Sequence, residues 1–256
     1  MVGLVDTDTS KAEQLLSDAE RVTVLTGAGI STSSGIPDFR GPQGVWTKDP
    51  SAQQVFTLQN YLADPAVRER SWQMRRDNAA WTAEPTAAHR ALVDLERAGR
   101  LRAIVTQNID GLHQAAGSTP DQVIEIHGTM WWVTCMSCGD RTPTPRVIQR
   151  LDAGESDPEC RECGGILKTA TISFGQALDE AVMDAAVDAA RDCDVFVAVG
   201  TSLQVYPAAG LCDVATGTGA RLLVVNAEPT PYDGDADAVL RDPIDDVLPR
   251  MVSAAC

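Results

Sequence analysis

Five short apolar runs constrain the fold most, because they alternate with helical patterns along the chain. They occupy residues 22–25, 103–105, 123–126, 195–199 and 222–225, with helical periodicity at about 86–99, 178–193 and 244–253. Strands without polar alternation are buried on both faces, which is typical of a parallel sheet covered by helices. The sequence therefore predicts an α/β fold. Ser10 and Glu13 also predict the start of an N-terminal helix, because they form a capping box.

A polar loop follows each apolar run: GAGIS, TQNID, HG, GTS and NAE, in chain order. In open parallel sheets, ligands bind beyond the carboxyl ends of the strands. We therefore expect these five loops to meet in one binding site.

Two of these loops have the composition of a phosphate site. Gly27-Ala-Gly29 follows the first run, but the third glycine of a dinucleotide fingerprint is replaced by Thr32. Alone, this pattern fits a tight turn equally well. The loop Gly200-Thr201-Ser202 adds backbone amides and hydroxyls for an anion, and Glu228, two residues after Asn226, can accept both hydroxyls of a ribose. Together they indicate a dinucleotide in a modified Rossmann pocket.

Candidate chemical groups lie in the remaining loops. One strand is followed by several amide and carboxylate groups, those of Gln107, Asn108 and Asp110. Another strand is directly followed by His127. At a strand end among these loops, we interpret His127 as functional. We expect the other two histidines, His89 and His113, to be structural.

Four cysteines predict a metal site. Cys135 and Cys138 form one C-x-x-C pair, and Cys160 and Cys163 form a second. Four thiolates at this spacing can surround Zn²⁺ and leave no open coordination position, so we expect a structural zinc ion. Two unrelated thiol pairs are the alternative. We expect the remaining three cysteines to be two core residues, Cys193 and Cys212, and one mobile thiol at Cys256.

Composition limits the setting. The chain has 256 residues and a formal charge of −15, which disfavours nucleic acid as the main partner. It contains no apolar run long enough to cross a membrane and no visible signal peptide. We expect a cytoplasmic protein without a disulfide framework.

Long motifs make the chain resemble the sirtuins, NAD⁺-dependent protein lysine deacylases, over about residues 10–250. The motifs are GAGIS…SGIPDFRG, TQNIDGLHQAAG, HG, the paired C-x-x-C, SFG, GTSLQVYPA and VNAEPT. The resemblance implies a Rossmann-like domain of residues 1–31, 86–128 and 169–256. It also implies a smaller domain, with a helical module at 32–85 and a zinc ribbon at 129–168. NAD⁺ and an acyl-lysine peptide would enter the cleft between the two, and we expect a monomer.

The resemblance also implies roles for individual residues. His127 matches the catalytic base, and Asn108 and Asp110 complete the catalytic set beside nicotinamide. His127 would remove a proton from a ribose hydroxyl, and the products would be lysine, nicotinamide and O-acyl-ADP-ribose. Other matching positions are, for NAD⁺, Gly27, Ala28, Gly29, Ile36, Asp38, Phe39, Arg40, Gln107, Gly200, Thr201, Ser202, Asn226 and Glu228, and, for acyl-lysine, Ile172, Phe174, Gly175 and Val205.

Two departures from the family pattern concern the substrate. The segment of residues 168–176 lacks the proline of the family and ends in Gln176 instead of glutamate. Members that prefer succinyl or malonyl groups carry Tyr-x-x-Arg where this chain has Trp72 and Arg75. We therefore expect uncharged acyl groups, and we expect Arg75 to lie on a solvated helix face. Mono-ADP-ribosyl transfer is the alternative enzyme activity, and a zinc-ribbon binding module that senses NAD⁺ is the alternative from another class.

Overall fold

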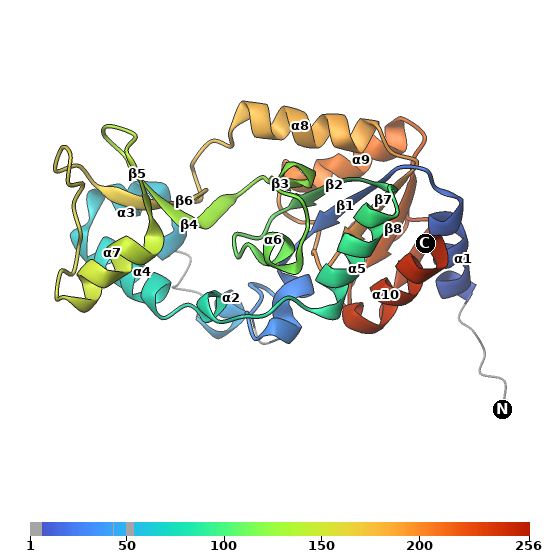
Figure 1. The fold of residues 1–256 in the computed structure, drawn as a ribbon, viewed down its shortest axis with the longest axis horizontal. Helices are drawn as coiled ribbons and strands as arrows, with labels where there is room; N and C mark the ends of the chain where they lie inside the picture. Colours follow the sequence, from blue (N-terminus) through green and yellow to red (C-terminus); the bar gives the residue numbers. More distant parts are fainter. Residues whose placement is uncertain (1–6, 43, 50–53) are drawn as a thin grey trace.

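The computed structural model describes residues 7–42, 44–49 and 54–256 (Figure 1). Within them, six strands form one parallel sheet in the order β3-β2-β1-β7-β8-β9. Numbered within this sheet alone, the order is 3-2-1-4-5-6, that of dinucleotide-binding folds. The predicted α/β class is therefore confirmed. The strands are β1 (Val22–Thr26), β2 (Leu101–Thr106), β3 (Val123–Glu125), β7 (Val195–Val199), β8 (Arg221–Val225) and β9 (Ala238–Leu240).

Helices cover both faces of this sheet, and each face has its own apolar core (Figure 1). One core joins the sheet to α1 (Thr7–Asp18), α5 (Ala87–Arg97) and α10 (Ile244–Ala255). The other joins it to α8 (Glu180–Arg191) and α9 (Leu211–Gly217). Burial on both sides explains why the strands read as continuous apolar runs.

The N-termini of two helices test the capping residues predicted from the sequence. Thr86 caps α5, as predicted, by accepting a hydrogen bond from the backbone N–H of His89. The predicted cap at Ser10 is wrong, because α1 already begins at Thr7 and Ser10 lies inside it. Asp8 stands in the first turn of that helix, where a negative charge favours the helix dipole.

A smaller part of the molecule lies at one end of the parallel sheet (Figure 1). Its antiparallel sheet has the order β5-β4-β6, and Trp72 anchors an apolar core together with side chains from this sheet and from α7. The sequence predicts the short helices of residues 42–85 but not the strands or α7. The elements are α2 (Val45–Lys48), α3 (Leu58–Ala63), α4 (Pro65–Arg76), β4 (Gly128–Cys135), β5 (Arg141–Pro143), α7 (Thr144–Asp152) and β6 (Leu167–Thr171).

Short elements complete the described chain. α6 (Leu112–Ala116) follows β2. A seven-residue 3-10 helix occupies Ala28–Ser34, and single 3-10 turns occupy Ala79–Trp81, Pro120–Gln122 and Ala208–Gly210. No helix of the described residues is long and apolar enough to cross a membrane.

Candidate functional site

A cleft of about 1610 Å³ lies between the carboxyl edge of the parallel sheet and the smaller part. All five predicted loops contribute to it, so the expected convergence is observed. Every residue predicted to contact NAD⁺ or acyl-lysine lines this cleft: Gly27, Ala28, Gly29, Ile36, Asp38, Phe39, Arg40, Gln107, Asn108, Asp110, His127, Ile172, Phe174, Gly175, Gly200, Thr201, Ser202, Val205, Asn226 and Glu228. Their individual roles remain predictions.

The loops after β1 and β7 meet at the point where the strand order reverses. The backbone N–H of Gly29 donates to the carbonyl oxygen of Gly200 over 2.8 Å. A Cβ on Gly29 would lie 2.6 Å from the Cα of Gly200, and Gly200 itself has a φ of +62°. Gly29 and Gly200 must therefore both be glycine. Because neither has a side chain, a ligand can approach the backbone of both loops closely.

A hydrogen-bond network joins the loop after β2 to the loop after β1. The Asn108 side-chain amide donates to the carbonyl oxygen of Gly27 and to Ser31 Oγ, over 3.1 and 3.2 Å. Ser31 Oγ donates in turn to Asp110 Oδ2 over 2.8 Å. The sequence prediction includes Ser31 only as the last residue of the phosphate loop GAGIS and gives its side chain no role.

Asp110 is held at the buried end of this network. Its Oδ1 accepts a hydrogen bond from the backbone N–H of Leu112 at 2.9 Å, and only 5% of the residue is exposed. Burial raises its pKa, although both hydrogen bonds favour the charged form. The two carboxylate oxygens are thus oriented before any ligand binds.

His127 is fixed in one tautomer. Its Nδ1 lies 3.0 Å from the carbonyl oxygen of Gln107, and because a carbonyl oxygen only accepts, Nδ1 carries the proton. In the neutral ring, Nε2 then has a free lone pair. Burial lowers the pKa of His127 below its usual value, and the hydrogen bond to Gln107 offsets part of that shift. The neutral form therefore dominates near pH 7 and can act as a base.

The loop after β8 is held by an arginine that sequence reasoning missed. Arg241 Nη1 donates to the carbonyl oxygens of Asn226 and Glu228, at 2.7 Å each. Its Nη2 pairs with Asp233. Arg241 directly follows β9, a three-residue strand that was not predicted either. The sequence around it therefore gave no sign that this arginine supports the loop.

The segment after β6 forms the opposite wall. The Ile172 N–H donates to the carbonyl oxygen of His127 over 2.8 Å. Phe174 pairs with Thr57 as an isolated bridge, and this residue, which is 45% exposed, lines the cleft. The side-chain oxygen of Gln176 accepts a hydrogen bond from Ser173 N–H, so glutamine here holds the turn as a carboxylate oxygen could.

Arg75 does not lie on a solvated face, so that expectation is wrong. The side chain is half-buried in the cleft wall, and its Nη2 donates to Thr171 Oγ1 over 3.2 Å. Burial lowers the pKa of Arg75 to about 10. Lys168, whose pKa burial and the charge of Arg75 lower to about 8, lines the same wall. Trp72, three residues before Arg75 on α4, packs into the small core instead.

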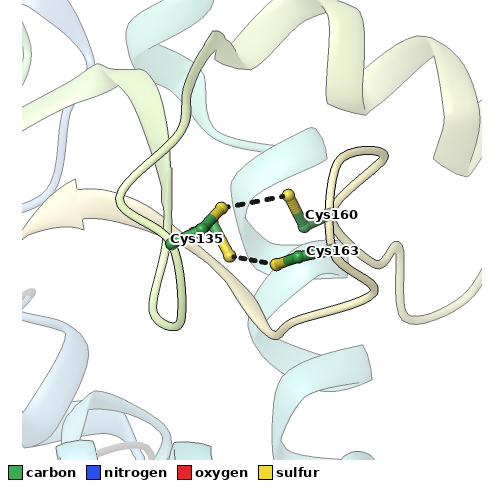
Figure 2. Close-up of side chains that lie close together, drawn as sticks. Cys135, Cys160 and Cys163 are labelled. Atoms are coloured by element: carbon green, nitrogen blue, oxygen red, sulfur yellow. Dashed lines mark hydrogen bonds between the residues drawn. The ribbon is translucent and has the colours of Figure 1, made fainter.

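The four predicted metal ligands come together (Figure 2), and none of them lines the cleft. Their sulfur atoms lie within 4.8 Å of one another, with Cys135 and Cys163 at 3.5 Å and Cys138 and Cys160 at 3.8 Å. Zn–S bonds of about 2.3 Å give a tetrahedron with edges of about 3.8 Å, whereas a disulfide needs about 2.05 Å. The four thiols therefore fit one zinc ion, as predicted.

The histidines and cysteines set aside as structural lie outside the cleft lining. His89 and His113 are buried side by side with ring centroids 4.8 Å apart. Cys193 and Cys212 are buried in the core, and Cys256 is exposed.

Known proteins resemble this chain over nearly its full length. The profile described as "Sir2 family" matches residues 27–207. NAD-dependent protein deacetylase 2 of Streptomyces coelicolor is 56% identical over 231 residues, which cover 90% of this chain and 96% of that protein.

Two solved structures of Sir2 enzymes share the whole fold. One has a TM-score of 0.88 at 38% identity, covering 98% of each chain. The other, a variant in complex with a deacetylated p53 peptide and 3'-O-acetyl ADP ribose, has a TM-score of 0.88 at 32% identity and covers 96% of this chain and 98% of its own.

Proposed function

The chain belongs to the Sir2 family, and on that basis we propose that it is an NAD-dependent protein-lysine deacetylase. It transfers the acyl group of lysine to ADP-ribose and releases nicotinamide. The observation that carries this proposal is the tautomer of His127: a neutral imidazole with a free Nε2, held at the junction of the strand-end loops and the small sheet. The Streptomyces relative is named for the same activity, and a related enzyme is known with the acyl-ADP-ribose product.

We assign the two ends of NAD⁺ to different loops. The pyrophosphate lies on the backbone of Ala28, Gly29 and Gly200, with the hydroxyls of Thr201 and Ser202 beside it. The adenosine ribose lies on Asn226 and Glu228, whose loop Arg241 fixes. These assignments follow the chemistry of the groups, since amides and hydroxyls bind phosphate and a carboxylate accepts from ribose hydroxyls.

The nicotinamide end is placed among Asn108, Asp110, Asp38 and Ile36, with Phe39 and Arg40 closing over it. Amide and carboxylate groups there can hold the carboxamide in a twisted orientation that weakens the glycosidic bond. Because Asn108 and Asp110 are already oriented through Ser31, little ordering is needed when NAD⁺ binds.

The acyl-lysine enters from the side of Ile172, Phe174, Gly175 and Val205, so its acyl oxygen faces the ribose carbon that nicotinamide leaves. The oxygen is a poor nucleophile, and correct placement is the main contribution of this wall. That oxygen bonds to the ribose carbon as nicotinamide leaves. His127 then takes a proton from a ribose hydroxyl through Nε2, which lets the hydroxyl oxygen attack the acyl carbon. The lysine amine leaves this carbon, and one water molecule completes the acyl-ADP-ribose.

The rest of the molecule supports this site. The zinc ion is structural, with four thiolates and no open position, and we divide the chain at the boundaries given above into a Rossmann-like and a smaller domain. One chain supplies every assigned residue, which supports a monomer as the working unit. None of the seven cysteines, all of which the structure describes, forms a disulfide, which supports a reducing, cytoplasmic setting.

The test follows both products with purified protein, NAD⁺ and an acetyl-lysine peptide. We expect nicotinamide and O-acetyl-ADP-ribose to form in equal amounts. His127→Asn keeps a donor for the Gln107 carbonyl but has no ring nitrogen, and we expect it to lower acyl transfer about 10²- to 10⁴-fold.

No nicotinamide release by the wild type, or full acyl transfer by the His127→Asn variant, would refute the proposal. NAD-derived label that stays on protein would indicate mono-ADP-ribosyl transfer instead.

A further inference from the structure

Trp131 connects three segments that are distant in sequence, yet it does not line the cleft. It lies on β4, and its indole Nε1–H donates to the main-chain carbonyl oxygen of Asp110 over 2.8 Å. Its ring meets that of Trp81 edge to face, with centroids 5.1 Å apart and planes at 84°. Trp81 Nε1–H donates in turn to the carbonyl oxygen of Arg75, the last but one residue of α4.

The backbone around this hydrogen bond is shaped to admit it. A Cβ on Gly111 would lie 2.5 Å from the Nε1 of Trp131, so a side chain at that position would displace the indole. One residue earlier on β4, the Met130 N–H donates to the carbonyl oxygen of Ile109 over 3.0 Å. Residues 109 and 110 are therefore both tied to β4 by their carbonyl oxygens.

The neighbouring tryptophan has none of these contacts. Trp132 is 40% exposed, and the guanidinium of Arg141 lies 5.2 Å from its ring centroid on the small sheet. Trp131 is exposed to a similar extent, at 39%. The two residues are therefore a matched pair on one strand, of which only the first reaches the loop that carries Asp110.

We propose that Trp131 is a positioning residue that fixes the nicotinamide end of the cleft through the main chain of Asp110. The proposal rests on the proposed function, because that function places nicotinamide beside Asp110. Ser31 and Leu112 hold the carboxylate of Asp110 from one side, and Trp131 holds its peptide group from the other. The ring contact with Trp81 links the Asp110 loop to the helical insertion of residues 32–85. The distance between these two walls of the nicotinamide pocket is thereby fixed.

The experiment compares Trp131→Phe, Trp131→Ala, Trp132→Phe and Trp132→Ala with the wild type. Phenylalanine keeps a ring for Trp81 but removes the N–H donor, and loss of one such hydrogen bond corresponds to about fivefold in binding. We expect Trp131→Phe to raise the KM for NAD⁺ and the inhibition constant of nicotinamide about fivefold, and Trp131→Ala to raise both by more. The KM for the peptide stays unchanged, and both Trp132 variants behave as the wild type.

Binding of ADP-ribose, which lacks nicotinamide, separates positioning from loss of structure. Measured by calorimetry, its affinity stays unchanged in the Trp131 variants, and their zinc content and Tm stay within the range of the Trp132 variants. Equal effects of the Trp131 and Trp132 substitutions, or parallel losses of ADP-ribose and nicotinamide affinity, would overturn the proposal. An inactive wild type would instead refute the proposed function, while the affinities for nicotinamide and ADP-ribose would still test Trp131.

Discussion

Gly200→Ala tests how closely the loops after β1 and β7 must approach. Alanine at a φ of +62° carries a backbone penalty of about 1–2 kcal/mol. Its Cβ would also lie 2.5 Å from the backbone nitrogen of Ile30, which cannot move aside as a flexible side chain would. Forced overpacking of this kind costs about 1–3 kcal/mol more. We expect the free energy of unfolding to fall by about 2–5 kcal/mol, and the KM for NAD⁺ to rise, because the displaced backbone borders the cleft.

Gly99→Ala is the matched control for this prediction. Its φ is +73°, and apart from Gly99 and its two chain neighbours, no heavy atom of the described structure lies within 4 Å of an added Cβ. Only the backbone penalty applies, so we expect a loss of about 1–2 kcal/mol. Replacing glycine by alanine also lowers the conformational entropy of the unfolded chain, which stabilises the folded protein. This gain is common to both variants and cancels when their free energies of unfolding are compared. Urea denaturation gives both values, and equal losses for the two variants would refute the close-packing argument.

Four further predictions concern the site and its supports. Because burial lowers the pKa of His127 and the neutral form is the base, the acid limb of kcat/KM should have its midpoint below about pH 6.5. A midpoint above that value would contradict this reasoning. Cys160→Ser should lower zinc content and the free energy of unfolding together, whereas Cys256→Ser, at an exposed thiol, should change neither. Arg241→Met frees the loop after β8 and should raise the KM for NAD⁺ about two- to tenfold, with the peptide KM unchanged. Lys168 has a pKa lowered from 10.5 to about 8, so between these two pH values it binds fewer protons in the folded than in the unfolded state. The free energy of unfolding should therefore gain a contribution that rises with pH in this window. Urea denaturation at several pH values should show this contribution in the wild type and not in Lys168→Met.

The sequence predicts those parts of the molecule that depend on local pattern. Five of the six strands of the parallel sheet coincide with strands predicted from the sequence, and the loops after them converge because parallel strands end at one edge. β9 was missed because three residues carry too little pattern. β4 was missed because two consecutive residues, Trp131 and Trp132, are both exposed and the register shifts between Gly128 and Val133, which breaks the period of two that marks a strand.

Other features depend on how the insertions pack onto the sheet. Arg75 was placed in solvent because helix periodicity shows which residues share a face, but not what that face meets. Its place in the cleft wall follows from the packing of α4 on the small sheet, where Trp72 fills the core and turns Arg75 toward Thr171. Trp131 likewise gains its contacts from Trp81 and Asp110, which lie 50 and 21 residues before it.

One strand connects the zinc ligands to the proposed base. β4 begins at Gly128, directly after His127, and ends at Cys135. The register shift shortens its span: β6 covers it in four steps of about 3.3 Å, from Leu167 opposite Cys135 to Thr171 opposite Gly128, so the two ends of β4 lie about 13 Å apart. The metal is therefore too distant to take part in the chemistry. Directly after β6, the Ile172 N–H donates to the carbonyl oxygen of His127. A zinc ion that fixes one end of this ladder therefore also limits the motion of His127 and Ile172 at the other, so loss of the metal should reduce acyl transfer through disorder of that wall.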